Sequence, residues 1–136
     1  MSRTRHYRDL IAWQKAMDLA RMIYARTEHF PQSETFGLRM QLRRSAVSVA
    51  SHIAEAHGRL DDADMRRGLG SARAAINEFQ TQTELAASLG FLDGSSSEEL
   101  LDLGTRVAKL INALLGVLDP DPKPPAPSEP ANLRRE

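Results

Sequence analysis

The fold is decided by the stretch FGLRMQLRRSAVSVASHIAEA at residues 36–56. Within it, apolar side chains recur every three or four residues, the spacing that places them on one face of an α-helix. These apolar residues are Leu38, Leu42, Ala46, Val49, Ile53 and Ala56. Gly58 follows two residues later, and glycine is the residue that most often ends a helix. The stretch therefore predicts a long amphipathic helix that begins near Thr35 or Phe36 and stops at Gly58.

Two of the neighbouring segments show the same helical spacing. Before the central stretch, apolar residues from position 10 to about 28 predict a helix with Asp9 as its N-cap, closed by Pro31. After it, a third helix is expected from Asp61 or Asp62 to Gly90, with the acidic cap residues favoured by the helix dipole. Short connections separate these segments, so consecutive helices should lie antiparallel.

A fourth helix is expected after the run Ser95-Ser96-Ser97-Glu98-Glu99. This run contains two overlapping capping boxes, in which Ser95 would pair with Glu98 and Ser96 with Glu99. The fold class is therefore predicted to be all-α, an up-down antiparallel four-helix bundle over residues 9–118. Residues 1–8 are expected to be a flexible basic N-terminus. Six of the seven prolines fall in residues 119–136, which predicts a disordered Pro-rich C-terminal tail or a ligand for a proline-binding domain.

The predicted helices carry more apolar residues than one buried face of about 100° requires. The extra residues are Ile11, Leu19, Ile23, Val47, Ala50, Leu101, Ile111, Leu115 and Leu118. Scattered exposed aliphatic side chains are normal on a monomer. The number found here instead favours a second buried face, so we expect a homo-oligomer.

The chain is neutral as a whole but divided in charge. It has 136 residues, with 18 basic and 18 acidic side chains. Residues 1–59 carry ten basic and five acidic side chains, and residues 60–119 carry five basic and ten acidic ones. Two interpretations stay open: the halves attract each other within the fold or between subunits, or the basic half binds a polyanion.

The sequence offers no constellation for catalysis, a metal or a cofactor. It contains no cysteine and no Glu-x-x-His motif of the kind that di-iron bundles use. Gly68-Leu69-Gly70 resembles part of a phosphate loop, but it lies inside a helical pattern, so close helix packing is the better interpretation. No stretch is long and apolar enough to span a bilayer, and no secretory signal is present. We therefore expect a cytoplasmic protein that is not an enzyme, with no membrane, metal or cofactor partner.

Arginines are the most suggestive feature. The candidate nucleic-acid-binding residues are Arg39, Arg43, Arg44, Arg59, Arg66 and Arg67. A guanidinium group can bind a phosphate with two parallel hydrogen bonds. Because the first three begin the central helix and the others follow its end, they should form two patches roughly 30 Å apart. The alternative is a solvated helix face, with Arg43 and Arg44 in structural ion pairs to Glu55, Glu78 or Glu84.

The central stretch resembles the signature of a bacterial four-helix-bundle family first noticed as open reading frames in 23S ribosomal RNA intervening sequences. The signature runs approximately F-G-L-x-x-Q-x-R-R-A-A-x-S-[IV]-x-x-N-I-A-E-G. The matching residues include Gln41, Arg43, Arg44, Ser48, Ile53, Ala54 and Glu55. His52 stands where the pattern has Asn, and Ala56 where it has Gly, which should lengthen the helix to Gly58. The start DLIAWQKAM at residues 9–17 resembles the family's opening as well.

The resemblance implies a homopentameric four-helix bundle without known enzymatic activity. The chain is also similar to the accessory variability protein of diversity-generating retroelements, a basic pentamer that binds nucleic acid and a reverse transcriptase. We accordingly expect a scaffold or accessory factor that binds structured RNA or DNA, with a reverse transcriptase or another protein as a further partner. The alternative is a protein-interaction scaffold with no nucleic-acid role, using its extra apolar face or its Pro-rich tail.

Overall fold

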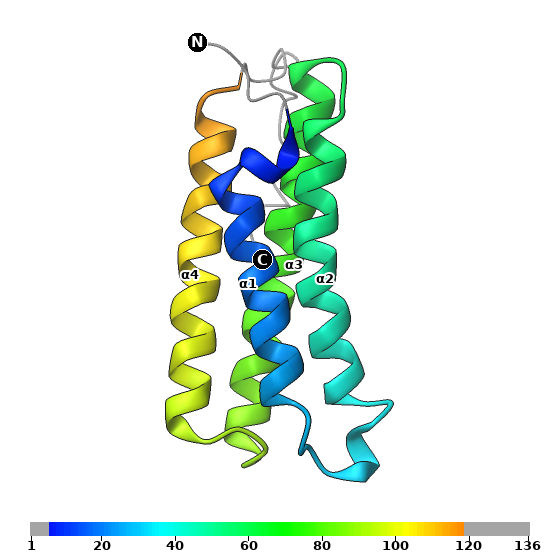
Figure 1. The fold of residues 1–136 in the computed structure, drawn as a ribbon, viewed down its shortest axis with the longest axis vertical. Coiled ribbons are helices and arrows are strands. Elements are labelled where there is room, and N and C mark those ends of the chain that lie inside the picture. The colour runs from blue at the N-terminus through cyan, green and yellow to red at the C-terminus, as the bar shows by residue number, and fades with distance from the viewer. Residues whose placement is uncertain (1–5, 119–136) are drawn as a thin grey trace, which may run out of the picture.

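The computed structural model describes residues 6–118 and folds them into four α-helices (Figure 1). The helices are α1 (Ile11–Arg26), α2 (Leu38–His57), α3 (Asp62–Ser88) and α4 (Gly94–Gly116), with short 3-10 helices η1 (Tyr7–Asp9) and η2 (Gln32–Glu34). No strand occurs within these residues. The predicted all-α fold is confirmed, whereas the predicted tail at 119–136 and residues 1–5 lie outside the described residues.

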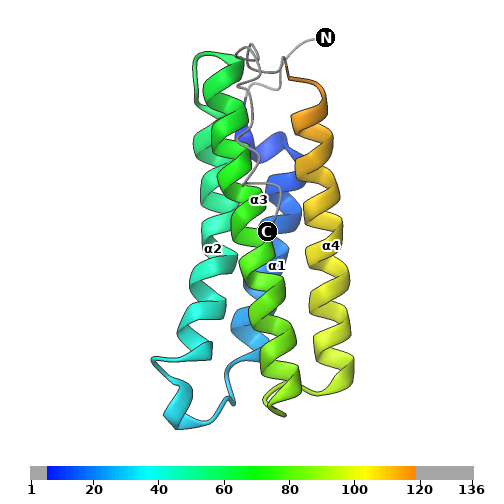
Figure 2. The same ribbon diagram turned by 180° about the vertical axis from the view of Figure 1, so that it is seen from behind.

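The four helices form a square up-down bundle. Each helix packs against the next one along the chain, and α1 also packs against α4. α1 and α3 therefore lie on one diagonal of the square, as the front and back views show (Figures 1 and 2). Of these helices, none is both long and apolar enough to cross a membrane.

The core is mainly aliphatic and is built by the helix faces that the sequence pattern indicates. On α2, Leu42, Ala46, Val49, Ile53 and Ala56 are fully buried. Complete burial of one large aliphatic side chain stabilises the fold by roughly 1.5–3 kcal/mol. The central stretch thus supplies one wall of the core along the whole length of α2.

Several residues counted as a second apolar face belong to the core of the single chain. Leu19, Ile23 and Ile111 are fully buried within the bundle. Helices in a square bundle each have two packed neighbours, so their buried face is wider than one narrow stripe. Ile11 and Val47 are exposed, so only part of the extra apolar surface remains available to a partner.

The helix ends confirm some predicted caps and correct others. Asp61 caps α3 by accepting a hydrogen bond from the N–H of Asp64 at 2.8 Å, and Gly58 ends α2. The prediction for Asp9 is wrong, because its own N–H closes the η1 turn and Leu10 occupies the N-cap of α1. The two capping boxes are also wrong: Asp93 is the N-cap of α4 and accepts from the N–H of Ser96 at 2.7 Å.

The glycine prediction is right at one position and wrong at the other. A Cβ on Gly68 would lie 2.8 Å from Cβ of Ala56, so α2 and α3 do approach closely there. Gly70 is exposed, and a Cβ on it would meet nothing within 4 Å. Gly68 is therefore a packing residue, whereas Gly70 has no packing role in the single chain.

The Asp93 cap should make stability depend on pH. The Ser96 N–H and hydroxyl, with a smaller contribution from Arg26, hold the pKa of the Asp93 carboxyl below its usual 3.8. Because the pKa of Asp93 is lower in the folded state, the stabilisation from its carboxylate is complete above pH 3.8. It is lost as the pH falls through the pKa of the folded state. We expect Asp93→Ala to lower the thermal midpoint at pH 7, and the difference from wild type to shrink between pH 4 and pH 2.

The control for this prediction is Asp93→Asn, because asparagine caps a helix without a titrating group. Its thermal midpoint relative to Asp93→Ala should stay constant over the same pH range. If the thermal midpoint of wild type exceeded that of Asp93→Ala by the same amount at pH 2 as at pH 7, Asp93 would not be the group whose titration changes stability.

Candidate functional site

The six arginines singled out by the sequence lie in two groups at opposite ends of the bundle. Arg39, Arg43 and Arg44 lie on the first two turns of α2, where α1 ends. Arg59 lies in the turn after α2, and Arg66 and Arg67 lie on the first turns of α3. A 20-residue helix spans about 30 Å, so one molecule presents two separate arginine patches.

Arg43 is bound within the chain. Its Nε donates to the hydroxyl of Thr27 at 2.9 Å, and its terminal nitrogen donates to the carbonyl oxygen of Tyr24 at 3.2 Å. The guanidinium carbon lies 4.4 Å from the centre of the Tyr24 ring. These acceptors lie at the C-terminal end of α1, where the helix dipole attracts a cation. Arg43 therefore ties α2 to α1.

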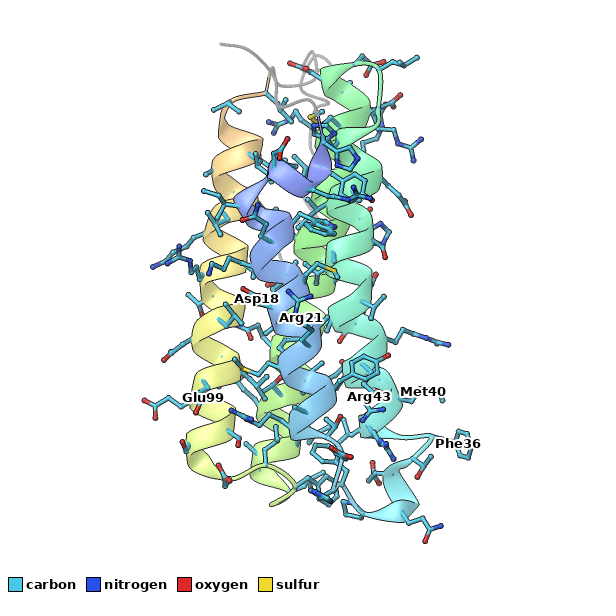
Figure 3. All side chains as sticks on the ribbon, in the orientation of Figure 1. Asp18, Arg21, Phe36, Met40, Arg43 and Glu99 are labelled. Carbon is cyan, nitrogen blue, oxygen red and sulfur yellow. The ribbon has the colours of Figure 1, made fainter. Side chains whose placement is uncertain are left out.

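Arg39 and Arg44 border an open groove on the outer side of α2, which we call the α2 groove. It has a volume of about 540 Å³ and is lined by Tyr24, Thr35, Phe36, Arg39, Met40, Arg43, Arg44 and Val47. The ring of Phe36 is 83% exposed. Figure 3 shows Phe36, Met40 and Arg43 along this side of the bundle. The groove combines apolar surface with three cations, and no carboxylate lines it.

The side chains of Arg39 and Arg44 form no hydrogen bond or ion pair to another residue of the range 6–118. The expected intrachain ion pairs to Glu55, Glu78 and Glu84 are not formed within this range. Glu78 instead accepts a hydrogen bond from the amide of Gln82 at 3.2 Å. The charge of the α2 groove is therefore not neutralised by the described part of its own chain.

The second arginine group surrounds a smaller pocket between the end of α2 and the start of α3. The pocket has a volume of about 340 Å³ and is lined by His52, Glu55, Arg59, Asp64, Arg67, Gly68 and Ser71. Arg67 forms an ion pair with Asp64. Arg59 is exposed, and its side chain has no hydrogen bond or ion pair to another described residue.

Arg66 differs from its neighbours, because its terminal nitrogen donates to the carbonyl oxygen of Leu115 at 2.8 Å. That carbonyl lies in the last turn of α4, whose final carbonyls lack partners within the helix. Arg66 thus connects α3 to the end of α4. Of the six candidates, Arg39, Arg44 and Arg59 are those whose side chains have no partner among the described residues.

Two polar contacts escaped sequence reasoning. The fully buried hydroxyl of Thr27 donates to the carbonyl oxygen of Ile23 at 2.7 Å while it accepts from Arg43. Gln82 is buried, and its Oε1 accepts from the hydroxyl of Ser45 at 2.8 Å. Ser45 and Gln82 are 37 residues apart in sequence, so only the packed bundle shows which helix supplies the partner of Ser45.

No cluster of three or more side chains suited to a metal ion occurs in the described part of the chain. What the molecule offers instead is two surfaces, a cationic apolar groove at one end and a polar arginine pocket at the other. Both suit recognition of a macromolecule through charge and contact area.

Comparison with known proteins places this chain in a family. The model described as 23S rRNA-intervening sequence protein matches residues 8–113. The fold is similar to the crystal structure of a protein of unknown function from the S23 ribosomal protein family of Bacteroides thetaiotaomicron. That likeness has 22% identity and a TM-score of 0.71, and covers 77% of this chain and 98% of the other. No curated protein matches the chain. Because the family model spans most of its length, the chain belongs to the 23S rRNA-intervening sequence protein family.

Proposed function

We propose that this protein is a cytoplasmic, non-enzymatic homo-oligomeric scaffold that binds structured RNA or DNA through the arginines at the α2–α3 turn. The observation that carries the proposal is the exposed guanidinium of Arg59, which has no partner within residues 6–118. Arg67 and His52 line the same pocket. These are groups that donate hydrogen bonds to phosphate oxygens.

The oligomer is part of the functional argument. A neutral protein with one or two phosphate contacts binds nucleic acid weakly, because the affinity grows with the number of phosphates neutralised. A cyclic homo-oligomer repeats the Arg59 end of each bundle on one rim. Simultaneous contacts from several copies raise the overall affinity without any new kind of contact. The family resemblance suggests five copies and a reverse transcriptase as a protein partner.

The test is a fluorescence anisotropy titration of a labelled RNA hairpin and a labelled DNA duplex at 50 and 200 mM salt. Arg59→Ala should weaken binding and flatten the slope of log affinity against log salt, by about 0.9 for each duplex phosphate that the variant no longer neutralises. Arg106→Ala is the matched control, since Arg106 is an exposed arginine of α4 away from the pocket. Its affinity and slope should stay near those of wild type.

Two results would contradict this proposal. One is the absence of binding tighter than about 10⁻⁴ M at 50 mM salt, the weak end of ordinary non-specific affinity. The other is an equal loss of affinity in Arg59→Ala and Arg106→Ala, which would show that only net charge matters.

The second candidate function is a protein-interaction scaffold without a nucleic-acid role. The exposed Phe36 and the apolar part of the α2 groove favour it. If the Pro-rich tail supplies the contact, deletion of residues 120–136 should abolish recovery of a partner in a pulldown. Unchanged recovery would count against the tail.

A further inference from the structure

The α2 groove has a complementary surface on another side of the same molecule. On the second half of α3 and at its C-cap, seven exposed residues share one side of the helix, and we call this surface the α3 face. It consists of Asn77, Glu78, Thr81, Glu84, Leu85, Ser88 and Leu89. No lysine or arginine occurs from residue 74 to 89. Leu85 and Leu89 are 47% and 55% exposed, and Glu84 has no ion pair within residues 6–118.

The two surfaces match in chemistry. The α2 groove presents three arginines and no carboxylate beside Phe36, Met40 and Val47. The α3 face presents two carboxylates and no cation beside two leucines. Each surface thus offers apolar side chains flanked by charges of one sign, and the two signs are opposite. Oppositely charged patches with an apolar centre are the arrangement expected of a specific interface.

The two surfaces also lie at the same height along the bundle. The contact between Ser45 on α2 and Gln82 on α3 marks one level on these antiparallel helices. Arg44 lies one residue before Ser45, and Glu84 lies two residues after Gln82, so their heights differ by about 1.5 Å at the usual helical rise. By the same measure, Met40 lies at a height between those of Leu85 and Leu89. Arg44 and Glu84, and the apolar groups beside them, are therefore level, whereas Arg39 and Glu78 differ in height by about 15 Å on the same measure.

One molecule cannot join these surfaces to each other. The α2 groove includes Tyr24 of α1, whereas the α3 face lies on the helix diagonally opposite α1. A second copy can bring its α3 face to the groove of the first. When the two bundles point the same way, level surfaces let the contact repeat by rotation about an axis parallel to the bundle, with little shift along it. A heterologous contact of this kind closes into a ring when the rotation divides a full turn evenly.

We infer that the α2 groove binds the α3 face of a second copy of this chain, with Arg44 of one copy against Glu84 of the next. This interface builds the homo-oligomer of the proposed function and rests on it. It assigns Arg39 and Arg44 to assembly. It leaves Arg59 and its pocket, at the other end of each bundle, available to phosphate.

The test uses charge reversal in the full chain, measured by analytical ultracentrifugation. The groove variant carries Arg39→Glu and Arg44→Glu, and the face variant carries Glu78→Arg and Glu84→Arg. Each places like charges across the interface, which should weaken association by about 100-fold or more. The variant with all four substitutions restores opposite charges and should assemble again. Unchanged circular dichroism of each variant confirms that the bundle is intact.

Mixing the groove and face variants gives a sharper result. The groove variant keeps an intact α3 face, and the face variant keeps an intact α2 groove. An equimolar mixture should therefore assemble, although each variant alone is monomeric, because each native surface meets its native complement and each reversed surface meets its reversed complement. This outcome is specific to a heterologous contact, because an isologous groove-to-groove contact would leave the face variant assembled by itself.

The proposal is overturned if wild-type protein is monomeric at about 100 µM, if either variant assembles like wild type, or if the four substitutions fail to restore assembly. These results do not decide the nucleic-acid role, which the Arg59→Ala titration tests on its own. Conversely, Arg59→Ala should leave the oligomer intact, so its loss of RNA affinity would not count as a failure of assembly.

Discussion

Replacing Gly68 with valine is expected to lower the free energy of unfolding by roughly 2–3 kcal/mol, the cost of overpacking a close contact. Even the first added carbon would lie 2.8 Å from Cβ and 3.1 Å from Cα of Ala56. The obstacle belongs to the backbone of α2 and to a side chain with no rotamer to change. The substitution therefore forces α2 and α3 apart. These two helices carry both proposed surfaces. Urea denaturation followed by circular dichroism measures the loss.

Gly70 supplies the matched control two residues away on the same helix. A Cβ at Gly70 meets nothing within 4 Å. Gly70→Ala should therefore raise the free energy of unfolding by about 0.5–1 kcal/mol, through the lower flexibility of the unfolded chain and the better helix propensity of alanine. Equal effects of Gly68→Val and Gly70→Ala would show that the close approach of α2 and α3 is not formed.

The contact between Gly68 and Ala56 can be tested from both of its sides. Gly68 on α3 and Ala56 on α2 face each other, and both are small residues. One small residue at this crossing is enough to let the helices approach. We therefore expect Ala56→Gly to relieve part of the cost of Gly68→Ala. The coupling between two residues in contact is typically about 0.5–3 kcal/mol in a double-mutant cycle.

The sequence predicts the backbone-level features of this protein well, because they depend on local spacing. The stripe from Leu42 to Ala56 is buried, and Gly58 ends α2. The first turn of α4 shows the limit of such reasoning. Ser95 and Ser96 fit a capping box, yet Asp93 precedes them and its carboxylate takes the cap. When several capping residues are adjacent, the packing of the whole loop decides which one begins the helix.

The candidate sites were harder to predict, since the role of an arginine depends on groups distant in sequence. Arg43 and Arg44 are adjacent and both match the family motif. One reaches Thr27 and Tyr24 on α1, and the other faces the open groove. A helix turns about 100° per residue, so neighbours in sequence point to different surroundings. The sequence pattern identified the arginines at the start of α2. Only the packed bundle shows that Arg43 is structural and that Arg44 is accessible.

Thr27→Val is expected to lower the free energy of unfolding by about 2 kcal/mol, within the range for hydrogen bonds to charged groups. Valine keeps the shape of threonine but removes the hydroxyl that accepts from Arg43 at 2.9 Å and donates to the carbonyl of Ile23 at 2.7 Å. Thr27 is fully buried, so water cannot replace the missing hydroxyl in place. Thr27→Ser keeps the hydroxyl and should retain most of the stability.

Arg43→Met should cost a similar amount, because it removes the same hydrogen bond together with the bond to the Tyr24 carbonyl. The Thr27→Val/Arg43→Met double variant should then be little less stable than either single variant, since both remove one shared interaction. Arg44→Met, one residue along, should change stability by less than about 0.5 kcal/mol, as is usual for an exposed side chain without partners. Full additivity in the double variant would contradict the link between α1 and α2. If Arg43 does join α2 to α1, an Arg43 variant that loses assembly or RNA binding does so because its bundle is loosened. Arg44 and Arg59 are then the residues whose substitution reports on the surfaces themselves.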